Sequence, residues 1–184
     1  MPRIFIALPV PEEAKNELEL AQNEIKRLNE RVPIKWTERQ NMHITLAFLG
    51  DITDGQAEQV KKVLDEAAKR PGFSIWLDSL DGFPDLNRPK VLVCAAAEEK
   101  RDCAKLHKDL EEKLFALGLE FEDHIWRPHI TLGRVKREWN NPNGLAAMPI
   151  EKINWLADKI ELIESELAPA GPVYNILQTF KLTP

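Results

Sequence analysis

The sequence predicts an α+β fold with two similar lobes, and three observations lead to this prediction. Short apolar stretches of strand length alternate with amphipathic stretches of helix length. No glycine-rich phosphate loop accompanies them, which argues against a parallel nucleotide-binding sheet. One tetrapeptide, His-Ile-Thr-Leu, occurs at residues 43–46 and again at residues 129–132. We therefore expect a single domain over residues 1–184, with two antiparallel or mixed sheets, flanking helices and a pseudo-twofold axis that brings the tetrapeptides together at a central cleft.

The first half of the chain carries strand and helix signals in turn. Pro9 and Pro11 end an apolar stretch, and two glutamates follow, which suits the first turn of a helix. Thr53 and Gln56 form a capping-box pattern ahead of a second helix. The predicted elements are a strand at 3–8, a helix at 12–29, a motif strand that Lys35 and Trp36 lead into and that ends at Gly50, a helix at 54–70 and a strand at 73–78.

The second half begins with an apolar stretch typical of a central strand. Leucines at helical spacing follow, and Gly118 ends that helix. His107 lies on this helix among charged residues and should be a plain surface residue, while His124 should lie in a loop. The predicted elements are a loop at 81–87, a strand at 91–96, a helix at 106–117, the second motif strand, a loop at 138–149, a strand at 155–166 and a closing strand at 174–182.

Both copies of the tetrapeptide alternate polar and apolar residues, as half-buried strands do. His43 and Thr45 therefore share one face, as do His129 and Thr131, while the isoleucines and leucines face the core. An imidazole exchanges protons near neutral pH, and a hydroxyl donates a hydrogen bond to a phosphoryl oxygen. Two such pairs supply a general acid, a general base and two hydroxyl donors. This set suits displacement at phosphorus with a bell-shaped dependence of rate on pH.

Two other interpretations of the tetrapeptide remain. Each histidine could be an exposed strand residue with a cross-strand neighbour, although two identical copies argue against this. Two histidines and a carboxylate could also bind zinc. The chain has no His-x-x-x-His or Cys-x-x-Cys spacing, so we expect neither a metal nor another cofactor.

Basic residues gather around the second tetrapeptide, within residues 127–137. Strand alternation places Arg134 on the apolar side, but a bulge at Gly133 would turn it toward the two histidines. The alternative is an exposed arginine at the end of the strand. Arg88 and Lys90 lie just before a predicted strand and are either a charged pair at the sheet edge or contacts to an RNA backbone.

Composition narrows the class of protein further. The net charge of −5 argues against broad, nonspecific coating of nucleic acid, but not against a locally basic site for one RNA end. The two cysteines, Cys94 and Cys103, are too few for a disulfide framework and fit a reducing compartment. No stretch approaches the length of a membrane span. We expect a cytoplasmic monomer that does not associate with membranes.

These motifs together resemble the two-histidine phosphoesterases, and within them the RNA 2′,3′-cyclic phosphodiesterases, also called the 2′-5′ RNA ligase family. The doubled tetrapeptide is the specific part of the resemblance, which covers nearly the whole chain. The supporting stretches are residues 3–8, 47–50, 88–93, 127–134 and 174–182.

The resemblance implies a metal-independent hydrolase that opens 2′,3′-cyclic phosphates at RNA 3′ ends, tRNA fragments among them, and leaves a 2′-phosphate. It implies that His43 is the proton donor to the 3′-oxygen and that His129 is the proton acceptor from water. Thr45 and Thr131 would hold the phosphoryl oxygens.

By the same resemblance, Arg134 would contact phosphate or ribose. Phe48, which strand alternation places in the core, would contact a nucleobase. Three alternatives stay open: 2′-5′ ligation of tRNA halves at the same site, an RNA-end binding module without catalysis, and a phosphodiesterase acting on small cyclic nucleotides.

Overall fold

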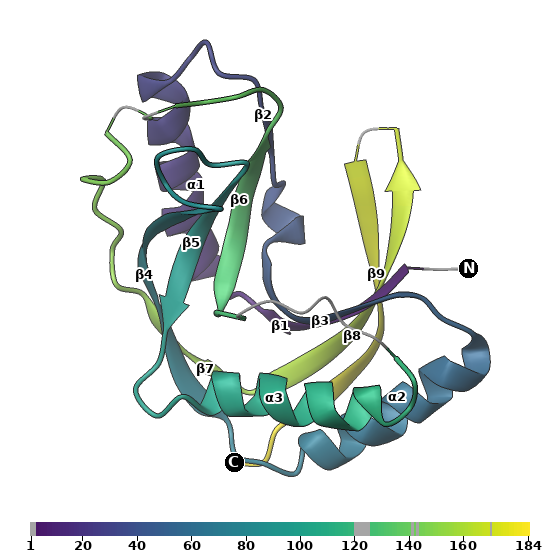
Figure 1. Ribbon diagram of the computed structural model, residues 1–184. Coiled ribbons are helices and arrows are strands. Elements are labelled where there is room, and N and C mark those ends of the chain that lie inside the picture. Colours follow the sequence, from purple (N-terminus) through teal and green to yellow (C-terminus); the bar gives the residue numbers. More distant parts are fainter. Residues whose placement is uncertain (1–2, 120–125, 141, 143, 170) are drawn as a thin grey trace.

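The fold is a curled antiparallel sheet with helices on its outer, convex side, as the computed structural model shows (Figure 1). The structure describes residues 3–119, 126–140, 142, 144–169 and 171–184. Within them, nine strands form one sheet in the order β7-β4-β5-β6-β3-β1-β8-β9, and β2 also pairs with β6. The strands are β1 (Arg3–Pro9), β2 (Ile34–Trp36), β3 (His43–Asp51), β4 (Phe73–Phe83), β5 (Val91–Ala97), β6 (His129–Val135), β7 (Asn154–Ala157), β8 (Lys159–Ala168) and β9 (Gly171–Lys181).

The helices form because their apolar residues recur on one side, which packs against the convex face of the sheet. They are α1 (Glu12–Leu28), α2 (Asp54–Ala67), α3 (Asp102–Phe115) and the short 3-10 helix η1 (Arg39–Asn41). The predicted capping box is present, since the Thr53 hydroxyl accepts from the Gln56 amide and the Gln56 side chain accepts from the Thr53 amide. A fully buried residue from each long helix, Leu18, Leu64 and Leu110, joins the same core as Ile6 of β1.

The two tetrapeptide strands meet at the middle of the sheet. Ile44 of β3 pairs with Ile130 of β6, and this one pair joins the two halves of the sheet. The α+β class is therefore confirmed, but the two expected sheets are continuous with each other. The pseudo-twofold relation of the lobes stays a prediction.

Beyond that pair the two strands diverge, and side chains from helices bond to backbone carbonyls that the strands no longer pair with each other. On β6, the Leu132 carbonyl accepts from the side chain of Gln22 on α1, at 2.9 Å. On β3, the carbonyl of Leu46 lies 2.8 Å from Nδ1 of His107 on α3. The prediction of a plain surface role for His107 was therefore wrong, since its imidazole supports the first tetrapeptide strand and also stacks on Trp126 at 4.3 Å.

Three element boundaries differ from the prediction. Asp81–Phe83 continue β4 instead of forming a loop, because they pair with residues 91–93 of β5. Lys35 and Trp36 belong to a separate strand, β2, which takes up the edge of β6 that β3 leaves. The stretch at 155–166 is divided between β7 and β8 at Asp158. The prediction for His124 lies outside the described residues.

Candidate active site

The sheet brings the four polar side chains of the tetrapeptides to its concave face. Because Ile44 and Ile130 pair antiparallel and point into the core, the residues on either side of them point the other way. Thr45 then lies across from His129, and His43 lies across from Thr131. The two imidazoles are close enough that a positive charge on His129 lowers the pKa of His43.

Both imidazoles are held in the same orientation by backbone. Nδ1 of His43 lies 2.7 Å from the carbonyl oxygen of Asn41, and Nδ1 of His129 lies 2.8 Å from that of Arg127. A carbonyl accepts only, so Nδ1 carries the proton in each neutral ring and Nε2 has a free lone pair. This arrangement leaves Nε2 of both rings as the atom that can exchange a proton with a ligand.

The two Nε2 atoms differ in their neighbours. Nε2 of His43 accepts from the hydroxyl of Thr45 at 2.9 Å. Among the described residues, no side chain or backbone group bonds Nε2 of His129. When the hydroxyl of Thr45 turns to donate to a phosphoryl oxygen instead, Nε2 of His43 becomes available for a proton.

Aromatic rings surround His43 and remove it from water. Phe5 lies 4.8 Å and Tyr174 lies 5.5 Å from its ring, measured between ring centroids. Burial lowers the pKa of His43 to about 4, against the opposing effect of the bond to Asn41. The free protein therefore holds this imidazole neutral, and a bound anion is needed to raise its affinity for a proton.

His129 has a more charged environment. Burial lowers its pKa, and the nearby guanidinium groups of Arg127 and Arg134 lower it further, whereas the bond to the Arg127 carbonyl and the charge of Asp81 oppose this shift. Phe83 contacts the imidazole edge-on, with 5.0 Å between centroids. Arg127 also lies over the Phe83 ring and forms an ion pair with Asp81 at 3.5 Å. A neutral imidazole beside two cations is suited to accept a proton when a phosphate anion offsets their charge.

The same β-bulge follows both tetrapeptides. In β6 the pairing with β5 passes from Thr131 to Gly133 and skips Leu132, which places Arg134 on the concave face. In β3 the pairing with β1 passes from Thr45 to Ala47 and skips Leu46. The predicted bulge beside Gly133 is present.

The corresponding bulge in β3 overturns the core position that alternation predicted for Phe48. This ring lies on the concave face with 65% of its surface exposed, at 5.9 Å from Phe5. Phe48 and Arg134 thus occupy equivalent positions, five residues after His43 and His129. The site combines an exposed aromatic ring on one half of the sheet with a guanidinium on the other.

Lys35 is a candidate anion-binding residue that sequence reasoning missed. In the β2–β6 pairing it lies directly across from Arg134, so two cations share one face. Like charges in this position repel each other, and a bound anion would relieve the repulsion. Sequence could not reveal the pair because β2 and β6 are far apart in the chain.

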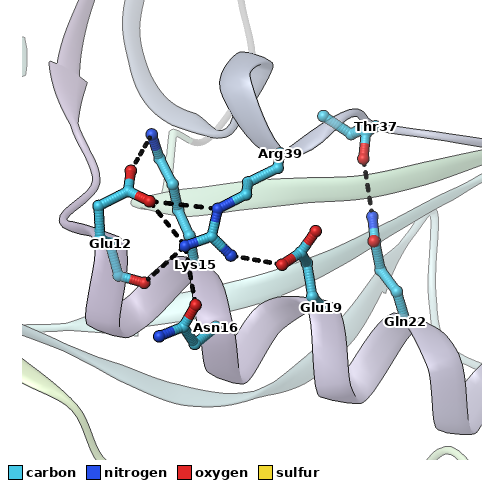
Figure 2. Close-up of polar contacts among 7 residues, drawn as sticks. All are labelled: Glu12, Lys15, Asn16, Glu19, Gln22, Thr37 and Arg39. Atoms are coloured by element: carbon cyan, nitrogen blue, oxygen red, sulfur yellow. Dashed lines mark hydrogen bonds and ion pairs between the residues drawn. The ribbon is translucent and has the colours of Figure 1, made fainter.

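A network around Arg39 fixes the chain just before His43 (Figure 2). Its guanidinium bonds to the Glu12 carboxylate at 2.7 Å, to the Glu12 carbonyl at 3.2 Å, to Asn16 at 2.8 Å and to Glu19. These contacts tie η1 to α1. Since Asn41 ends η1 and its carbonyl holds Nδ1 of His43, the network positions the imidazole indirectly.

Other observations bear on the remaining predictions. Within the described part of the chain, no three His, Cys, Asp or Glu side chains gather as metal ligands would. No helix in that part is long and apolar enough to cross a membrane. Cys94 and Cys103 are both buried and unpaired with each other.

Known proteins are similar to this chain in sequence and fold. A family model described as LigT like Phosphoesterase matches residues 8–93 and 95–174. The RNA 2′,3′-cyclic phosphodiesterase of Aquifex aeolicus is 33% identical in an alignment that covers 92% of this chain and 93% of that protein. The RNA 2′,3′-cyclic phosphodiesterase of Methanocaldococcus jannaschii is 31% identical in an alignment that covers 96% of this chain and 98% of that protein. The crystal structure of TT0787 of Thermus thermophilus superposes with a TM-score of 0.79 at 27% identity, covering 98% of this chain and 97% of that one.

Proposed function

The chain belongs to the LigT-like phosphoesterase family, and from that premise we propose that it hydrolyses 2′,3′-cyclic phosphates at RNA 3′ ends to 2′-phosphates. One observation carries the proposal. Two identical His–Thr pairs face one another on the concave face of the sheet, each with Nδ1 held by a carbonyl, which leaves Nε2 as the ring atom that can exchange a proton. Relatives named RNA 2′,3′-cyclic phosphodiesterase, similar over nearly their whole length, support it.

The proposed reaction assigns a separate role to each imidazole. His129 takes a proton from water through its unbonded Nε2, and the water oxygen forms a bond to phosphorus. The bond from phosphorus to the 3′-oxygen breaks, and His43 gives its proton to that oxygen. The cyclic phosphate anion raises the pKa of His43, which is about 4 in the free protein, and so allows the ring to carry the proton.

Neighbouring residues would bind the rest of the RNA end. Thr45 and Thr131 donate their hydroxyls to phosphoryl oxygens, and Arg134 supplies the positive charge next to them. Phe48 offers an exposed ring on which the terminal base stacks. Protein groups supply every proton and donor in this scheme, so it needs no metal.

Turnover of a short RNA that ends in a 2′,3′-cyclic phosphate tests the proposal. We expect a 2′-phosphate product, a rate unaffected by EDTA, and a loss of about 10² to 10⁴-fold in either His43→Ala or His129→Ala. Thr45→Val and Thr131→Val should lose less, and Lys62→Gln, an exposed change on α2, should lose nothing. Binding of the RNA without turnover would instead favour an RNA-end binding module, and a rate abolished by EDTA would contradict the acid–base scheme.

A further inference from the structure

We propose that the hydroxyl of Tyr174 donates a hydrogen bond to the phosphoryl group that binds between His43 and Arg134. Tyr174 lies on β9, which carries neither tetrapeptide, and it is the only tyrosine of the chain. The inference rests on the proposed function and deepens it, because it adds a third hydroxyl to the two threonines that hold the phosphoryl oxygens.

Tyr174 reaches the site from the far side of the sheet. Two strands, β1 and β8, separate β9 from β3, which amounts to about 14 Å across a flat sheet. The ring centroids of Tyr174 and His43 are nevertheless only 5.5 Å apart. The sheet is curled, and Figure 1 shows β9 and β6 on opposite sides of its concave face. Tyr174 therefore leans across the two intervening strands toward the imidazole.

Packing on the concave face fixes the ring of Tyr174. Phe5 contacts it edge-on, with 5.0 Å between centroids, and Ser165 of β8 pairs with it across the strands. Phe5, Ala7 and Ile163 are buried and form a small hydrophobic cluster with Tyr174, separate from the main core. A ring that is packed before the ligand arrives loses little conformational freedom on binding. The hydroxyl is therefore held in place in the free protein.

The hydroxyl has no protein partner but lies within reach of a positive charge. Among the residues that the structure describes, no group forms a hydrogen bond with it. Burial raises the pKa of Tyr174, and the charge of Arg134 opposes this rise, so the guanidinium acts on the hydroxyl across the concave face. The phenol stays protonated at neutral pH and can donate. An anion held by Arg134 would supply the acceptor that the protein does not.

A neutral donor at this position should favour the later stages of the reaction. The cyclic phosphodiester carries one negative charge, whereas the phosphomonoester product carries up to two. Hydrogen bonds to phosphoryl oxygens strengthen as the charge on those oxygens grows. We therefore expect the Tyr174 hydroxyl to stabilise the transition state and the product more than the bound substrate, which means that it acts on kcat more than on KM.

The first measurement is the affinity for adenosine 2′-phosphate, measured by calorimetry, which needs no turnover. Tyr174→Phe keeps the ring and removes only the hydroxyl, so we expect this affinity and kcat each to fall about tenfold, with little change in KM. Thr179→Val removes a hydroxyl from an exposed position of the same strand and should change neither value. Equal affinity in Tyr174→Phe and the wild type would overturn the proposal.

Two further readouts separate the hydroxyl from the packing of the ring. Tyr174→Leu exposes His43 and should shift the pH profile of kcat/KM, whereas Tyr174→Phe should leave the profile in place. Because the chain has one tyrosine, ring labelling with carbon-13 gives a single tyrosine environment by NMR, whose signal should move as adenosine 2′-phosphate binds. A profile that shifts in Tyr174→Phe, or a tyrosine signal that does not move, would show that only the packing matters and would overturn the proposal.

Turnover distinguishes failure of this inference from failure of the proposed function. If the wild type and Tyr174→Phe open the cyclic phosphate at the same rate, the proposed function stands and the role of Tyr174 falls. If Tyr174→Phe weakens the binding of adenosine 2′-phosphate but neither protein opens a cyclic phosphate, Tyr174 stands as a phosphate ligand and the proposed hydrolase function falls.

Discussion

Replacing His43 by asparagine should remove much of the acid sensitivity of folding. Phe5 and Tyr174 bury the imidazole, and burial lowers its pKa to about 4 from the 6.5 expected in an unfolded chain. Between these two values the unfolded chain binds a proton at His43 that the folded protein does not. The stability from neutral His43 is therefore fully present above pH 6.5 and is lost as the pH falls toward 4.

The expected size of this effect follows from the two pKa values. One unit of pKa difference between the folded and unfolded states corresponds to about 1.4 kcal/mol, so His43 contributes about 3 kcal/mol to the change in unfolding free energy between neutral pH and pH 4. This is a large share of the roughly 5–15 kcal/mol that typically stabilises a domain. The effect should be measurable against other groups that titrate in the same range.

Urea unfolding at several pH values provides the assay. The stability lost between neutral pH and pH 4 should be about 3 kcal/mol smaller in His43→Asn than in the wild type. Any cavity that the substitution leaves costs the same at each pH and cancels in the comparison. Thr45→Val is the control, because it removes the hydrogen bond to Nε2 but keeps the imidazole. An identical loss in His43→Asn and the wild type would refute the assigned burial of His43.

Three further predictions concern the site and its support. Because burial lowers the pKa of both imidazoles, the alkaline limb of the pH profile of kcat/KM should lie below pH 6.5. Bound phosphate should shift the alkaline limb of the kcat profile upward. An alkaline limb of kcat/KM above neutral pH would contradict this prediction. Gly133→Ala should cost about 1–3 kcal/mol in a denaturant titration, since its Cβ would lie 2.7 Å from a methyl of Ile34, whereas Ala47→Gly should cost less; equal losses would argue against close packing of β2. Phe48→Leu should raise KM about tenfold with little change in kcat, and an unchanged KM would exclude base stacking there.

The sequence could predict which side chains share a face at the site because the periodicity of a strand is local. Alternation alone assigned His43 and Thr45 to one face and Ile44 to the other, and the pairing of Ile44 with Ile130 agrees. The capping box at Thr53 is local too, and it is present. Such predictions succeed where a residue is determined by its near neighbours in the chain.

The same reasoning failed where a distant segment decides the outcome. Alternation placed Phe48 in the core, but a bulge after Thr45 turned it to the opposite face. The glycine at position 133 indicated the equivalent bulge in β6, whereas the alanine at position 47 did not indicate a bulge in β3. His107 has the sequence neighbours of an ordinary helical surface residue, and nothing local indicates that the diverging edge of β3 needs a hydrogen-bond partner. Its contact to Leu46 spans 61 residues of the chain.

In the proposed RNA complex, the difference between Gly133 and Ala47 would let the two identical tetrapeptides contact different parts of the substrate. Both are followed by the same bulge, so the local backbone does not distinguish them. Among the strands that the structure describes, β2 pairs only with β6, and its backbone and Ile34 come too close to residue 133 for a side chain there. That close pairing also places Lys35 beside Arg134, which makes the β6 half cationic. The β3 half carries an exposed Phe48 at the equivalent position, so the proposed RNA end is oriented with its phosphates along β6 and its terminal base over β3.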